Sequence, residues 1–169
     1  MYVQIDLDGP AGTLRVSGHE LPTVELVRGP GDEPDPLIPI GTRAAGRLTL
    51  TVDGAPAVLR PARGRILRRS YRVDATVAGT RYRLVPCSYG ESRLLRDGRV
   101  LGTLESTGDG TVDADWAPGT ETGAGTGAET GAAPEPLDRV VGTALAAAFG
   151  TGAAPWWDTT LNIAAELIP

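Results

Sequence analysis

The sequence is poor in the residues on which much enzyme chemistry depends. It contains one cysteine, Cys87, and one histidine, His19, and all 16 of its basic residues are arginine. A single cysteine excludes an intrachain disulfide and a zinc site built from several cysteines. Without lysine, the chain can form neither a lysine Schiff base nor the lysine contact of a P-loop. We therefore expect a non-enzymatic protein that uses no cofactor and no metal.

Aromatic residues are also scarce, and long apolar runs are absent. Aromatic residues make up 5% of the chain against 41% for all hydrophobic residues, so the core has to be mostly aliphatic. No run reaches the roughly 18 to 20 apolar residues of a membrane-spanning helix. Residues 1–9 have the pattern of a strand and not that of a signal peptide. These features predict a soluble, cytoplasmic protein.

Charge is present in quantity but is strongly segregated. Residues 1–42 carry a net charge of −5, residues 43–100 carry +9, and residues 101–169 carry −9, which together give the −5 of the whole chain. The middle of this acidic protein is therefore basic. For a partner, such local fields matter more than the net charge.

Residues 1–116 consist of short alternating segments separated by turn signals. Asp53-Gly54 and Asp97-Gly98 are strong two-residue hairpin signals, and another turn is expected at residues 78–80. Residues 28–42, rich in proline and acid, are expected to form an irregular loop. Between the turns, one set of side chains is predicted to face inward: Leu48, Leu50, Val52, Tyr71, Val73, Ala75, Val77, Tyr82 and Leu84. This spacing predicts a mainly β fold, an antiparallel β-barrel or sandwich.

The last third of the chain has a different character. Residues 117–135, made of Gly, Ala, Thr, Glu and Pro, are expected to form a flexible loop. Residues 136–150 predict a helix that is apolar nearly all round and therefore buried. A second helix is expected after Asp158, and Trp156-Trp157 is interpreted as an anchor for the tail. We expect residues 136–169 to pack into the same domain as residues 1–116.

A β meander followed by one buried apolar helix resembles the tubby C-terminal-like family, which includes the LURP-one-related proteins and the phospholipid scramblases. The matching segments are SYRVDATVAGTRYRLVP, SRLLRDGRVLGTL and the late helix DRVVGTALAAAF. The resemblance implies a closed antiparallel barrel around a hydrophobic C-terminal helix. It also implies a non-enzymatic scaffold that, in some members, binds phosphoinositide through basic residues. The Gly-rich segment before the helix and the tail with two tryptophans depart from the family pattern.

The stretch RPARGRILRRSYR, residues 60–72, belongs to the basic middle of the chain. Arginines here and in the following hairpins are candidates for binding an anion such as phosphoinositide, phosphate or a nucleic-acid backbone. The candidates are Arg65, Arg68, Arg69, Arg72, Arg81, Arg83, Arg96 and Arg99. The favoured alternative is that these arginines pair with acidic segments of the protein itself or of a second copy of the chain. Arg96 and Arg99, for example, should face each other across the Asp97-Gly98 turn, which is unfavourable unless a carboxylate or an anion lies between them.

Other candidate residues carry weaker signals. Two acid pairs, Asp6 with Asp8 and Asp113 with Asp115, could bind Ca²⁺ or act as an acid/base pair, but solvent-facing alternation explains both. Cys87 is expected to be small and at least half-buried.

The preferred interpretation is a non-enzymatic binding or structural module. Its alternatives are an anion-, phosphoinositide- or nucleic-acid-binding protein acting through Arg60–Arg99, and, least favoured, a hydrolase that uses Asp113, Asp115 or Cys87. An anionic ligand, a protein partner and a second copy of the chain all stay open as partners. Nucleic acid is disfavoured, because inward-facing Tyr71 and Tyr82 could not stack on bases.

Overall fold

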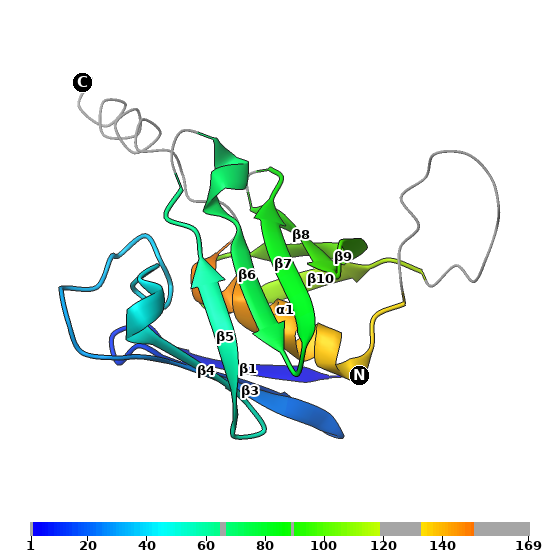
Figure 1. The fold of residues 1–169 in the computed structure, drawn as a ribbon, viewed down its shortest axis with the longest axis horizontal. Coiled ribbons are helices and arrows are strands. Elements are labelled where there is room, and N and C mark those ends of the chain that lie inside the picture. Colours follow the sequence, from blue (N-terminus) through cyan, green and yellow to red (C-terminus); the bar gives the residue numbers. More distant parts are fainter. Residues whose placement is uncertain (1, 65–66, 89, 119–132, 151–169) are drawn as a thin grey trace, which may run out of the picture.

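The computed structural model describes residues 2–64, 67–88, 90–118 and 133–150. It forms one ten-stranded antiparallel sheet in which every strand pairs with its neighbours in the chain (Figure 1). The strands are β1 Val3–Asp8, β2 Thr13–Gly18, β3 Leu21–Arg28, β4 Leu48–Val52, β5 Ala55–Pro61, β6 Val73–Val77, β7 Thr80–Pro86, β8 Glu91–Arg96, β9 Arg99–Ser106 and β10 Val112–Trp116. Two 3-10 helices, η1 Ala45–Arg47 and η2 Arg68–Tyr71, flank β4 and β6, and one α-helix, α1 Pro136–Phe149, follows the sheet. The predicted mainly β fold with a C-terminal helix is confirmed.

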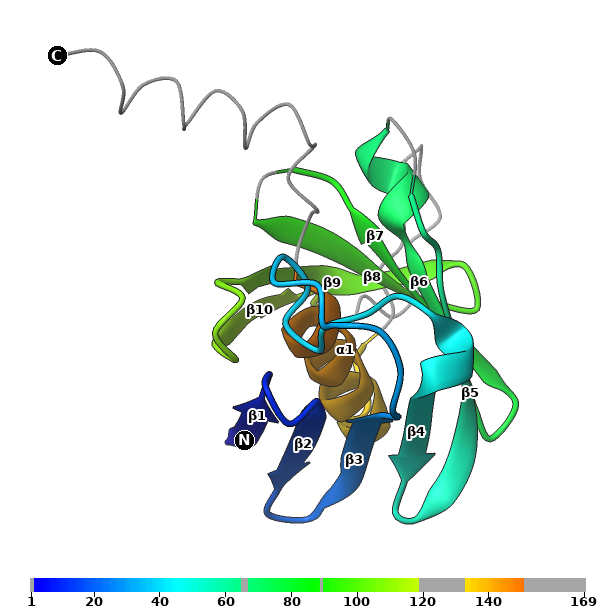
Figure 2. The same cartoon turned by 90° about the vertical axis from the view of Figure 1, so that its left-hand side faces the viewer.

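The sheet curls into a half-barrel around α1 (Figure 2). β1 and β10 are its two edges, and no described strand pairs with the outer edge of either. The turn between β9 and β10 nevertheless reaches β1, since a Cβ placed on Gly110 would lie 3.3 Å from the Cβ of Leu7. The helix is thus enclosed by a sheet whose two edges approach each other without forming a ladder.

Helix α1 begins and is buried as its sequence predicts. Pro136 occupies its first turn, and Glu135 and Asp138 form a reciprocal capping box. From Val140 to Phe149 every residue is buried. Small residues allow this close fit: a Cβ on Gly142 would lie only 2.4 Å from Cδ2 of Leu94 on β8. A glycine in mid-helix costs about 1 kcal/mol relative to alanine, and here it lets the helix lie directly against the sheet.

Three tight hairpins set the register of the meander. Asp53, Ala78 and Asp97 each have a φ of 48° and are followed by a glycine with positive φ, as type I′ turns require. Because β7 begins at Thr80, the middle turn uses only two of the three predicted residues. The aspartate side chains also join two of these turns to the strand before the hairpin: Asp53 accepts a hydrogen bond from the Thr23 N–H at 2.7 Å, and Asp97 accepts one from the Arg81 N–H at 3.1 Å.

The predicted start of one strand was wrong. Val73, Ala75 and Val77 are buried as the alternation indicated, but β6 begins at Val73. Tyr71 instead belongs to η2 and is half-buried. Its ring lies against the guanidinium of Arg43, 5.4 Å from the ring centre. Alternation along a strand cannot predict a contact with a residue 28 positions away in the chain.

Several sequence-based expectations lie outside the described residues. They concern Arg65, most of the Gly-rich segment (residues 119–132), Trp156-Trp157 and the second C-terminal helix. Within the described part of the chain, no helix combines the length and the hydropathy needed to cross a membrane.

Candidate functional site

Four of the eight candidate arginines, Arg72, Arg81, Arg83 and Arg99, lie on the convex side of the sheet, pointing away from the helix. We call this surface the outer arginine face; its members are Arg60, Arg72, Arg81, Arg83, Arg93 and Arg99. Arg69 is exposed on η2, and the side chain of Arg68 is outside the described part of the structure. The arginines therefore spread over several strands and do not converge on one point.

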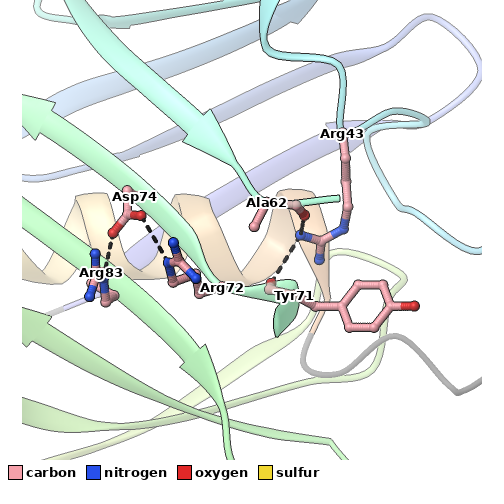
Figure 3. A network of polar contacts seen from close by, with 6 residues as sticks. All are labelled: Arg43, Ala62, Tyr71, Arg72, Asp74 and Arg83. Atoms are coloured by element: carbon pink, nitrogen blue, oxygen red, sulfur yellow. Dashed lines mark hydrogen bonds and ion pairs between the residues drawn. The ribbon is translucent and has the colours of Figure 1, made fainter. Parts of the chain in front are cut away.

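Carboxylates of the protein pair with Arg72, Arg81 and Arg83 of the outer arginine face. Asp74 lies between two of them: its Oδ1 accepts a hydrogen bond from Nε of Arg83 at 2.5 Å, and its Oδ2 accepts one from Nε of Arg72 at 3.3 Å (Figure 3). The bond to Asp74 raises the pKa of the Arg83 guanidinium above its ordinary value. Arg81 forms a longer ion pair, with 3.9 Å between its Nε and Asp97.

The side chain of Arg96 does not belong to the outer arginine face. It is paired in register with Arg99 across the turn, but a bulge between Leu94 and Leu95 interrupts the ladder just before it. Nη1 of Arg96 lies 2.7 Å from Asp138 and 2.9 Å from Glu135 at the start of α1. Burial opposes its charge, but these two carboxylates raise its pKa above the usual value. The like-charge pair expected at this turn is avoided because one arginine turns inward to acids of the C-terminal segment.

The inward turn of Arg96 completes a buried polar cluster at the first turn of α1. Asp138 is 1% exposed. It accepts a hydrogen bond from the Tyr82 hydroxyl at 2.8 Å, one from Nη1 of Arg96 at 2.7 Å and one from the Glu135 N–H at 2.7 Å. Burial, together with the bond to Asp138, raises the pKa of Tyr82 above its ordinary range. Every group here is satisfied, so we assign the cluster to fixing the helix.

The outer arginine face carries two hollows, of about 640 and 500 Å³. One, of about 640 Å³, is lined by Cys87, Arg93 and Arg99 together with apolar residues of β7 to β9. Cys87 is exposed, so the prediction that it is at least half-buried was wrong. It follows Arg81, Arg83 and Val85 on the outward side of the alternation, and its Sγ donates to the Glu91 carbonyl at 3.5 Å.

A second kind of site, which the sequence did not reveal, lies at the end of the half-barrel beside the last turn of α1. A cavity of about 500 Å³ opens there, between the loop that follows β3, the residues around η1 and η2, and the end of the helix. We call it the Arg43 cavity. Its lining is Asp32, Glu33, Asp35, Leu37, Ile38, Gly41, Thr42, Arg43, Ala44, Arg47, Arg63, Tyr71 and Phe149.

Arg43 is the most unusual residue of this cavity. It is only 9% exposed, and its guanidinium lies 5.4 Å from the ring centres of both Tyr71 and Phe149. Its Nη1 donates hydrogen bonds to the carbonyls of Ala62 at 3.1 Å and Tyr71 at 3.0 Å (Figure 3). No described residue accepts a hydrogen bond from its Nε or Nη2. Buried charges are normally paired, so this arrangement is uncommon.

The guanidinium of Arg43 stays charged although it is buried. Desolvation lowers the pKa of its guanidinium to about 10, and the nearby charges of Tyr71 and Asp35 oppose this shift. At neutral pH the group is still protonated. No described carboxylate forms an ion pair with it, in contrast to Arg83 and Arg96.

The loop that carries Arg43 is firmly attached to the rest of the fold. The Ile40 N–H donates to the carbonyl of Ala148 at 2.9 Å, which satisfies one of the free carbonyls at the end of α1. Ile40 itself is fully buried. Arg28 donates to the carbonyls of Ile40, Gly9 and Pro10 at 2.8, 3.1 and 2.7 Å. Arg43 therefore projects from an anchored backbone.

Acidic side chains surround the mouth of the Arg43 cavity. Asp32, Glu33 and Asp35 are all exposed. Arg63 is exposed as well, whereas Arg47 is half-buried and donates through Nη2 to the carbonyl of Asp32 at 3.0 Å. The bottom of the cavity is thus positively charged, and its rim carries a net negative charge.

The remaining candidates are solvent-facing. Asp6, Asp8, Asp113 and Asp115 are exposed on the edge strands, as alternation predicted. Within the described residues, no three His, Cys, Asp or Glu side chains gather in a way that could hold a metal ion. His19 is exposed in the turn between β2 and β3.

Comparisons with known proteins add no relatives. No family model, no curated protein and no solved structure matches this chain.

Proposed function

We propose that the protein is a non-enzymatic binding module that takes a small anionic group, a carboxylate or a phosphate, into the Arg43 cavity. The observation that carries this proposal is the buried guanidinium of Arg43, which borders a cavity of about 500 Å³ and has no carboxylate partner among the described residues. Cavities of this size are typical of small-molecule sites.

The energetics favour an external anion. Removing a charged group from water is costly unless it is paired and hydrogen-bonded. The two aromatic rings and the two carbonyl acceptors hold the plane of the Arg43 guanidinium in place. A preorganised guanidinium that still has unused N–H donors can bind a carboxylate or a phosphate with little loss of side-chain entropy.

The direct test is an NMR titration of the whole 169-residue chain with butyrate and with inorganic phosphate. We expect saturable shifts near Tyr71 and Phe149, and a 10- to 100-fold weaker affinity in Arg43→Gln, because a hydrogen bond to a charged group contributes about 1.5 to 3 kcal/mol. Arg60→Gln, which removes an exposed charge on β5, is the matched control and should bind like wild type. Thermal unfolding of each variant establishes that it is folded. A folded Arg43→Gln protein with wild-type affinity would refute the proposal.

The outer arginine face supports a second candidate, binding of an anionic surface such as phosphoinositide-containing membrane. Arg60 and Arg99 are exposed there and form no ion pair with a described carboxylate. The resemblance to the tubby C-terminal-like family is a proposal of the same kind. The curled sheet around a buried C-terminal helix supports it, whereas the outer edges of β1 and β10, with which no described strand pairs, are a departure from a closed barrel.

Co-sedimentation with vesicles separates this candidate from the first. If the outer arginine face binds membranes, the protein should pellet with vesicles that contain phosphoinositide and not with phosphatidylcholine alone. The triple variant Arg60→Glu, Arg81→Glu, Arg99→Glu should then lose at least about tenfold in partitioning, since each basic residue near an anionic surface contributes about 1 kcal/mol. Arg15→Glu is a suitable control, because Arg15 is paired with Glu25 on the other half of the sheet. Equal pelleting of the triple variant and wild type would exclude this face.

A further inference from the structure

The charges around the Arg43 cavity are arranged in two layers. Its lining includes three arginines and three carboxylates, so its formal charge is close to zero. The most deeply buried charge is Arg43, and all three carboxylates are exposed at the rim. A ligand that enters the cavity therefore meets negative charge first and positive charge last.

The carboxylate of Asp35 is held away from pairing with Arg43 by the loop itself. Asp35 donates its N–H to the Gly41 carbonyl at 2.8 Å, and its own carbonyl accepts from the Ile38 N–H at 3.2 Å. One carboxylate oxygen of Asp35 accepts a hydrogen bond from the Leu37 N–H at 2.9 Å. These bonds within the loop keep the Asp35 carboxylate apart from the Arg43 guanidinium, so both charges can interact with a ligand.

From this arrangement we propose that the ligand of the Arg43 cavity is a small zwitterion. Its anionic group binds Arg43, and its cationic group lies beside the carboxylates of Asp32, Glu33 and Asp35. The inference rests on the binding function proposed above and specifies the chemical class of the ligand. A plain dianion fits less well, because it would be repelled by the acidic rim.

The apolar part of the lining indicates what joins the two charged groups of the zwitterion. Leu37, Ile38 and Phe149 line the same cavity, so a short alkyl chain joining the two charged groups can contact them. Free ω-amino acids and phosphorylated amino alcohols have this combination of groups. Pockets of this kind are usually apolar with a few polar groups that fix orientation.

The experiment compares matched pairs of probes by NMR titration of the same 169-residue chain. The pairs are 4-aminobutyrate with butyrate, 6-aminohexanoate with hexanoate, and phosphoethanolamine with ethyl phosphate. We expect at least one zwitterion to bind about tenfold or more tightly than its partner without the amino group. In the variant Asp32→Asn, Glu33→Gln, Asp35→Asn this preference should fall to nearly one, while the simple acid binds as well as before or better. The control Asp6→Asn, Asp8→Asn removes exposed carboxylates from β1 and should leave the preference unchanged.

The outcomes separate the two proposals. If a simple acid binds through Arg43 and every zwitterion binds no better than its partner, the zwitterion inference is overturned and the anion-binding function stands. The same conclusion follows if the preference survives in the triple variant. If neither member of any pair binds, or if binding does not depend on Arg43, the proposed function fails and the inference fails with it.

Discussion

Replacing Asp138 with alanine is expected to lower the free energy of unfolding by about 3 to 5 kcal/mol, the usual cost of breaking a buried ion pair from one side. The carboxylate is 1% exposed and accepts hydrogen bonds from Tyr82, Arg96 and the Glu135 N–H. Its loss would leave the Tyr82 hydroxyl buried without its acceptor, and Arg96 with only the more exposed Glu135. Urea denaturation followed by circular dichroism measures the change.

The control for this substitution is Asp115→Ala, which removes an exposed carboxylate from β10 and should change stability by no more than about 0.5 kcal/mol. The double variant Asp138→Ala, Tyr82→Phe should lose less than the sum of the two single variants, because Tyr82→Phe removes the hydroxyl that the first change leaves without its acceptor. A loss below about 1 kcal/mol in Asp138→Ala would mean that the cluster does not fix the helix.

Enlarging Gly142 is expected to have an effect of similar size. Even a single Cβ at this position would lie 2.4 Å from Cδ2 of Leu94, so Gly142→Leu must displace either the helix or β8. Overpacking of a well-packed core costs typically 1 to 3 kcal/mol and sometimes more. We expect a loss of about 3 kcal/mol in urea denaturation, even though leucine has the higher helix propensity.

A compensating change tests the geometry behind this expectation. Leu94→Ala alone should destabilise by about 2 to 5 kcal/mol, because it leaves a cavity next to the helix. Combined with Gly142→Leu it should recover a large part of the loss, since the new side chain can occupy the vacated volume. Strictly additive losses would show that the two positions do not meet in the folded protein.

Much of the fold could be predicted because its determinants are local. A two-residue signal such as Asp53-Gly54 or Asp97-Gly98 specifies a type I′ turn, and alternation on either side specifies the inward face. The run from Val140 to Phe149, apolar nearly all round, predicted a buried helix, and it forms one. If the alternation of β7 is continued past the end of the strand, it places Cys87 on the outward side, with Arg81 and Arg83.

The candidate site could not be predicted, because its determinants are distant in the chain. The irregular loop was expected, but nothing in its composition shows that Arg43 meets Tyr71 and Phe149, which lie 28 and 106 positions further on. The arginines that did attract attention were those that cluster in sequence. Those whose side chains the structure describes are distributed over several elements and are exposed, except for Arg96, which turns inward. Burial is what distinguishes Arg43 from them, and burial of a loop residue is a property of the assembled fold.

The order of elements has a consequence for how the chain acquires its structure. The strands pair only with their neighbours, so the meander can form progressively from β1 as the chain is synthesised. Its concave side, which includes the fully buried Val16, Leu94 and Leu104, is covered by a helix that lies some twenty residues after the last strand. Until that helix leaves the ribosome, a nascent sheet would present an uncovered apolar surface. We expect this interval to be the one in which the protein is most prone to aggregate and most dependent on chaperones.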